Sequence, residues 1–167
     1  SRGMEYGEIV SMPETERAIR TALQSAQKLA NSRVDHVIAC ISGGSPRSYG
    51  LEGTVDIKTG IVDDNDIADV LGSCGIPAYG SDREVLHAQP VNFSLDHRTG
   101  LSDPRGQIGK KLSVDMHMLT VKEKTIHDLA YCLKRCDLEL AGVASASYAS
   151  ALSSLVEDEK ELGAACI

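Results

Sequence analysis

The chain has 167 residues, of which 42% are apolar and 25% charged, and its formal net charge is −7 at pH 7. That is enough apolar material for one fair-sized domain or two small ones, and it excludes a disordered chain. The acidic balance argues against a nucleic-acid partner, because binding to the phosphate backbone depends on clustered basic charge. No apolar run approaches the roughly 18–20 residues that are needed to cross a bilayer.

The N-terminal part predicts a helix followed by a strand. The segment "SMPETERAIRTALQSAQKLAN" (11–31) has Ser11 as N-cap, Pro13 in the first turn and Glu14 three residues after the cap, which is a capping-box pattern. Apolar residues then recur at helical spacing. "VDHVIACI" (34–41) is a short apolar run rich in β-branched residues and is typical of a buried strand.

The middle of the chain predicts strand, helix, strand and strand. A strand is expected within 48–57, and an acidic helix start at Asp63 leads to a helix that ends by Gly75. A strand region over 83–96 is expected to be broken at Pro90, "HRTG" is expected to turn the chain, and 110–121 alternates as a long strand.

The C-terminal part predicts alternating helices and strands. We expect a helix over 124–136, a strand over 138–144, a largely helical segment over 147–163, and the opening of another strand at "AACI". The outer parts thus read as an α/β domain, and the β-rich middle, about 42–120, reads as a small module inserted into it.

The stretch "ISGGSPRSYG" (41–50) raises the question of a phosphate-binding loop. A Walker loop needs G-x-x-x-x-G-K-[ST] at the start of a helix, but Leu51 and Glu52 follow Gly50 here and the next element has strand periodicity. The spacing of a dinucleotide-binding loop is absent too. We therefore interpret the stretch as a turn between two strands.

The sequence predicts no catalytic, cofactor-binding or metal-binding residue. Cys132, Cys136 and His127 share one predicted helix, but zinc normally takes four ligands and no second pair is present, so the two thiols are expected in the core. The serines around Tyr148 lack the G-x-S-x-G pattern of a nucleophile elbow.

Basic residues gather in and beside the turn-rich stretch "HRTGLSDPRGQIGKK". A local basic patch on exposed loops of an acidic protein suggests a partner-binding surface, although solvated charge is the alternative. The candidate residues are Arg83, Arg98, Arg105, Lys110 and Lys111.

Several long strings resemble the FtsA family of actin-like bacterial cell-division proteins. They are "SRGMEYGEIVSMPETERAIRTALQSAQKLA", the "SGG" after the first strand, "LHAQPVNFSLD", "KLSVDMHMLT" and "LKRCDLELAGVASASYASALSSLVEDEKELG". The resemblance implies a partial actin-like (ribonuclease H-like) subdomain, 1A, with an inserted strand-helix-strand-strand (SHS2) subdomain, 1C. Residues 1–41 and 121–167 would then belong to 1A, and 42–120 to 1C.

The resemblance also implies function. In that family 1C recruits later division proteins, including the cytoplasmic tail of FtsN, and contributes to self-association, which would make this chain a protein-interaction module rather than an enzyme. ATP with magnesium, the tubulin-like FtsZ and the inner face of the cell membrane at the division site are implied for a full-length member. Their sites, including the FtsZ-binding subdomain 2B and the membrane helix, are expected outside residues 1–167.

Two alternatives stay open. One is an actin-like ATPase of type IV pilus assembly, which shares the architecture. The other is an ATP-hydrolysing actin-like enzyme, if the chain is longer and carries glycine-rich phosphate loops.

Overall fold

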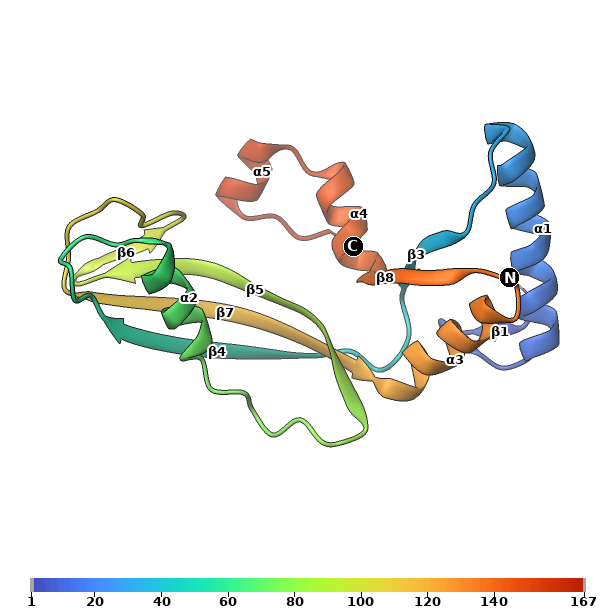
Figure 1. The fold of residues 1–167 in the computed structure, drawn as a ribbon, viewed down its shortest axis with the longest axis horizontal. Helices are drawn as coiled ribbons and strands as arrows, with labels where there is room; N and C mark the ends of the chain where they lie inside the picture. The colour runs from blue at the N-terminus through green and yellow to red at the C-terminus, as the bar shows by residue number, and fades with distance from the viewer. Residues whose placement is uncertain (1, 167) are drawn as a thin grey trace. The chain divides into compact units, whose positions relative to one another are not determined.

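The computed structural model describes residues 2–166, which divide into two compact units. Unit 1 comprises residues 1–46, 82–86 and 121–167, and unit 2 comprises 47–81 and 87–120. The elements in chain order are β1 Met4–Glu5, β2 Glu8–Ile9, α1 Met12–Ala30, β3 His36–Ile41, β4 Arg47–Asp56, α2 Asp64–Gly72, β5 Arg83–Leu95, β6 Arg98–Leu101, β7 Lys111–Lys122, α3 Glu123–Lys134, β8 Glu139–Ser145, α4 Ala146–Ser154 and α5 Glu157–Leu162 (Figure 1).

Unit 1 is built on a parallel pair of strands, β3 and β8. Apolar side chains of α1 and α3 pack against this pair around Leu133, Cys136 and Leu138. Cys132 and Cys136 are buried, which confirms the prediction that they are core residues, and this burial raises the pKa of both thiols. Of the other three cysteines, Cys40 and Cys166 are exposed and Cys74 is half-buried.

Helix α1 confirms the predicted helix but not its predicted cap. Ser11 holds the N-cap position with an extended backbone, yet its side chain makes no capping hydrogen bond. The buried Thr15 hydroxyl instead donates to the carbonyl oxygens of Gly3 (3.0 Å) and Ser11 (2.9 Å). The capping box with Glu14 is therefore wrong, because a side chain one residue further along joins the helix start to the N-terminal segment.

Unit 2 contains a four-stranded sheet in the order β4-β7-β5-β6, and α2 packs on β4 (Figure 1). The predicted capping at the start of α2 is confirmed, since the Asp63 carboxylate accepts from the backbone N–H groups of Asn65 and Asp66. Alternating residues of β7 face the core as predicted. The buried core residues are Ile57, Val62, Ile67, Val70, Phe93, Leu95, Leu112 and Val114.

Strand β5 runs through Pro90 without the predicted break. Its pairing with β6 is confined to Phe93 and Leu95, so β6 does not pair with it at residue 90. Proline has no amide hydrogen, so it contributes no backbone donor to the sheet at this position. The turn predicted at "HRTG" is present but begins one residue earlier, at Asp96 (φ 54°) and His97, and β6 begins at Arg98.

Three further differences lie in unit 1. The hairpin of β1 and β2, which turns at Tyr6 and Gly7 with positive φ, was not predicted from the sequence. The helical region after β8 is split at residues 155–156 into α4 and α5. The strand predicted at "AACI" is wrong for 164–166, which have no regular secondary structure, and residue 167 lies outside the described residues.

Candidate interaction surface

Three of the predicted basic residues lie together on the loops of unit 2. Arg98 opens β6 and donates through Nη2 to the carbonyl oxygen of Ile108 (3.2 Å). The Asp96 carboxylate accepts from the backbone N–H groups of Lys110 (3.0 Å) and Lys111 (2.9 Å). These hydrogen bonds hold the loop before β7 against the β5–β6 turn, so the three exposed cations, which we call the basic loop cluster, share one region.

Exposed apolar side chains lie beside the basic loop cluster. Ile61 and Ile108 form an isolated antiparallel bridge and are 51% and 77% exposed. Apolar side chains that stay in water next to cations are typical of a surface that binds another protein. The chemistry favours a partner segment with carboxylates and apolar side chains.

Arg105 lies nearby but its charge is already neutralised. Its guanidinium pairs with the carboxylates of Asp64 (2.7 Å) and Asp103 (3.0 Å). The hydrogen bond that the Arg105 guanidinium donates to the Asp103 carboxylate raises the pKa of Arg105, and the hydrogen bond that the backbone N–H of Arg105 donates to Asp103 lowers the pKa of Asp103. Arg105 therefore joins the loop to the start of α2 and contributes little net positive charge.

Arg83 does not belong to an exposed basic surface. It lies in unit 1 with 7% of its surface exposed, and its Nη2 donates to the carbonyl oxygen of Ser45 at 2.6 Å. The sequence shows that Arg83 is charged but does not show that it is buried, and for this reason Arg83 was grouped with the other basic residues. In the structure it fastens the loop that leaves β3.

That loop, residues 42–45, is the glycine-rich stretch of the sequence. A Cβ on Gly43 would lie 2.6 Å from the carbonyl oxygen of Gly7, so the loop packs closely on the β1–β2 hairpin. Gly44 has φ +85° and accepts from the backbone N–H of Lys122. These contacts support the interpretation of the loop as a structural turn.

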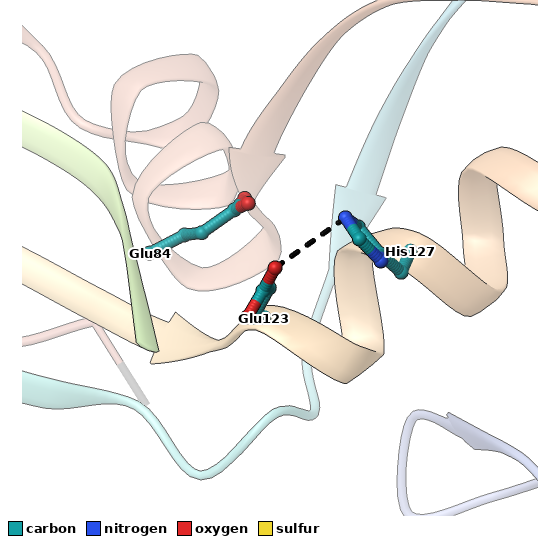
Figure 2. A group of neighbouring side chains, drawn as sticks. All are labelled: Glu84, Glu123 and His127. Carbon is teal, nitrogen blue, oxygen red and sulfur yellow. Dashed lines mark ion pairs between the residues drawn. The ribbon is translucent and has the colours of Figure 1, made fainter. Parts of the chain in front are cut away.

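Two other features of unit 1 were not predicted. An apolar cavity of about 630 Å³ lies among β3, α1 and α3. A cluster of Glu84, Glu123 and His127 brings ligand atoms within 4.8 Å of one another (Figure 2). Its one signal in the sequence is the spacing of Glu123 and His127, because Glu84 is 39 residues upstream of Glu123.

The Asp96 carboxylate accepts the two backbone hydrogen bonds that fix the loop before β7. The backbone N–H groups of Lys110 and Lys111 hold the pKa of Asp96 below its usual range. A carboxyl with a lowered folded-state pKa stabilises the fold above its unfolded value of about 3.9, and this contribution is lost as the pH falls through the folded-state pKa.

We therefore expect Asp96→Asn to lower the urea midpoint at neutral pH, and the difference from the wild type to shrink below about pH 4. Urea denaturation at several pH values checks this. Asp115→Asn, on the exposed side of β7, is the control for loss of a carboxylate. A deficit that stays constant into acid would contradict the role of the Asp96 carboxylate.

Comparison with protein families gives a match to the SHS2 domain inserted in FtsA over residues 43–120. The chain is 36% identical to the cell division protein FtsA of Rhizobium meliloti (strain 1021) over 167 residues, which are 100% of this chain and 38% of that protein. It is 33% identical to FtsA of Pseudomonas aeruginosa and 26% identical to FtsA of Escherichia coli K12, covering 98% of this chain and 39% of each relative. The chain thus spans well under half of these relatives.

A solved structure, the PilM-PilN type IV pilus biogenesis complex, matches with a TM-score of 0.57 over 90% of this chain and 39% of that chain. The sequence identity is 10%, so this likeness concerns the fold alone. Within residues 2–166, no helix is long and apolar enough to cross a membrane. The mixed α/β fold, partly actin-like with an SHS2 module, is as predicted, and the chain is similar over its whole length to the cell division protein FtsA.

Proposed function

We propose that this chain is part of a cell-division protein and that its SHS2 module is a protein-interaction surface. Its role is to recruit later division proteins and to mediate FtsA self-association. The observation that carries this proposal is the basic loop cluster of Arg98, Lys110 and Lys111 beside the exposed Ile61 and Ile108. The family supports it, because the curated relatives are cell division proteins.

Charge favours a second copy of the protein as one partner. The chain has 24 acidic and 17 basic residues, so most of its surface charge is negative while the loop cluster is positive. Complementary charge steers association and fixes its register more than it adds affinity. The cytoplasmic tail of FtsN is the other candidate partner that we propose.

The proposed role is binding rather than catalysis. The chain spans 38% of the length of FtsA from Rhizobium meliloti, and for a full-length protein of that kind we propose ATP with magnesium as cofactor, FtsZ as a partner through another subdomain, and a place on the inner face of the cell membrane at the division site. None of these is assigned to a residue of this chain. A pilus-assembly ATPase is less favoured, because the likeness to the PilM complex has 10% identity.

The experiment compares a triple charge reversal, Arg98→Glu, Lys110→Glu and Lys111→Glu, with the wild-type chain. Self-association is measured by sedimentation velocity, and binding of a labelled FtsN tail peptide by fluorescence anisotropy. We expect the triple variant to change at least one affinity about tenfold at low salt, and the difference to shrink at high salt because exposed charges are screened.

The control is a triple reversal in unit 1, Arg17→Glu and Lys28→Glu together with Arg2→Glu, which changes the net charge equally at exposed positions. It is expected to leave both affinities near the wild-type values. Unchanged affinity of the loop variant in both assays, with an intact fold by circular dichroism, would overturn the proposed surface.

A further inference from the structure

Three side chains of types that can bind a metal ion converge in unit 1. Glu123 and His127 lie one turn apart on α3, with Glu123 Oε1 and His127 Nε2 3.6 Å apart. Glu84, near the start of β5, directs its carboxylate toward them (Figure 2). The ligand atoms of all three residues lie within 4.8 Å of one another.

The backbones that carry these ligands are joined to one another. The backbone N–H of Glu123 donates to the carbonyl oxygen of Asp82 (2.9 Å), two residues before Glu84. Arg83, which lies between Asp82 and Glu84 in the sequence, is buried and donates a hydrogen bond to the carbonyl oxygen of Ser45. The convergence is therefore fixed by main-chain and buried contacts rather than by three long side chains that meet on an open surface.

The charges of this cluster are not balanced by the protein alone. Glu84 and Glu123 are half-buried carboxylates, and among the described residues neither forms an ion pair with a lysine or an arginine. The nearby Lys124 pairs with Asp128. Two carboxylates this close repel one another, and a bound cation would relieve the repulsion.

We propose that Glu84, Glu123 and His127 bind a divalent transition-metal ion, with Zn²⁺ as the best fit. One imidazole nitrogen and two carboxylate oxygens suit zinc, with water in the fourth position, whereas Ca²⁺ and Mg²⁺ prefer oxygen ligands alone. Two ligands at about 2.1 Å from a tetrahedral zinc ion lie about 3.4 Å apart. The 3.6 Å between Glu123 and His127 is close to this, so mainly Glu84 must move to close the site.

A metal ion at this site links β5 to α3. The two elements are far apart in sequence, and the ion binds the folded arrangement better than the unfolded chain. It therefore stabilises the fold by RT ln(1 + [Zn²⁺]/Kd). The proposed role is to stabilise the region where the chain enters and leaves unit 2.

The test is calorimetric titration of ZnCl₂ into the whole metal-free chain, together with thermal denaturation. The exposed Cys40 and Cys166 are replaced by serine in every variant, because free thiols compete for zinc. We expect saturable binding of one ion per chain and a higher melting temperature with zinc. Glu84→Gln and His127→Ala should each weaken binding at least tenfold and remove the thermal shift.

The matched control is His36→Ala. His36 and Glu139 form a second exposed histidine–glutamate pair in unit 1, with His36 Nε2 and Glu139 Oε2 3.2 Å apart, and they belong to no three-ligand group found among residues 2–166. His36→Ala should leave zinc affinity unchanged. Absence of saturable binding, or equal affinity in Glu84→Gln and the parent, would overturn the proposal. Metal-free melting temperatures show whether each variant folds.

Discussion

Replacing Gly53 with alanine is expected to destabilise the chain by about 3 kcal/mol, at the upper end of the usual cost of overpacking. Gly53 lies in β4 where α2 crosses the sheet. A Cβ there would lie 2.5 Å from the carbonyl oxygen of Val70 and 2.6 Å from Ser73 Oγ. The nearest atom is helix backbone, so α2 must move as a whole, and Val70, which is fully buried, moves away from the core with it.

Gly50 provides the matched control for this prediction. It lies in the same strand, and a Cβ there would meet no atom within 4 Å. Gly50→Ala should therefore be neutral or stabilise the chain by up to about 1 kcal/mol, since alanine loses less conformational entropy on folding. Urea denaturation of both variants measures the difference. Equal midpoints for the two would show that α2 does not pack on Gly53 as described.

The order of elements could be predicted from the sequence because most of them bury one face. The alternating apolar residues of β7 and the helical spacing in α1 and α3 place side chains in the two cores. Such patterns are set by the elements' own geometry, with periods of about 2 and 3.6 residues. They identify which segments form strands and helices without knowledge of their neighbours.

The predictions of secondary structure that failed concern positions where contacts with other segments determine the local structure. Strand β5 continues through Pro90 between its neighbours β7 and β6, and Ser11 is not the capping side chain because Thr15 bonds to Gly3. Neither fact is encoded in local spacing. The short β1–β2 hairpin was missed for a similar reason, because two-residue strands carry too few residues to show a period.

The sequence predicted which residue types form the candidate site, but it did not predict which of the basic residues are paired with acids or buried. The sequence indicated a group of basic residues, and the structure brings Arg98, Lys110 and Lys111 together. It also pairs Arg105 with two acids and buries Arg83. Two of the contacts behind these differences join residues far apart in sequence, Arg105 with Asp64 and Arg83 with Ser45. The Glu84–Glu123–His127 cluster was missed because it too is formed across the fold.

The burial of Arg83 leads to the second large effect. Arg83→Met should destabilise the chain by about 1.5–3 kcal/mol, because it removes a charged hydrogen-bond donor from the Ser45 carbonyl oxygen in a buried setting. Methionine keeps much of the side-chain volume, so the loss reports the hydrogen bond more than a cavity. Chemical denaturation of the whole chain measures it.

Arg98→Met separates this structural role from a role in binding. Arg98 is exposed on β6, so its loss should change the free energy of unfolding by no more than about 0.5 kcal/mol. The two variants should therefore have opposite profiles, with Arg83→Met unstable but normal in partner affinity under folding conditions, and Arg98→Met stable but altered in affinity. If Arg83→Met were as stable as the wild type, the loop at 42–45 would not depend on Arg83. If folded Arg83→Met had an altered partner affinity, Arg83 would belong to the interaction surface after all.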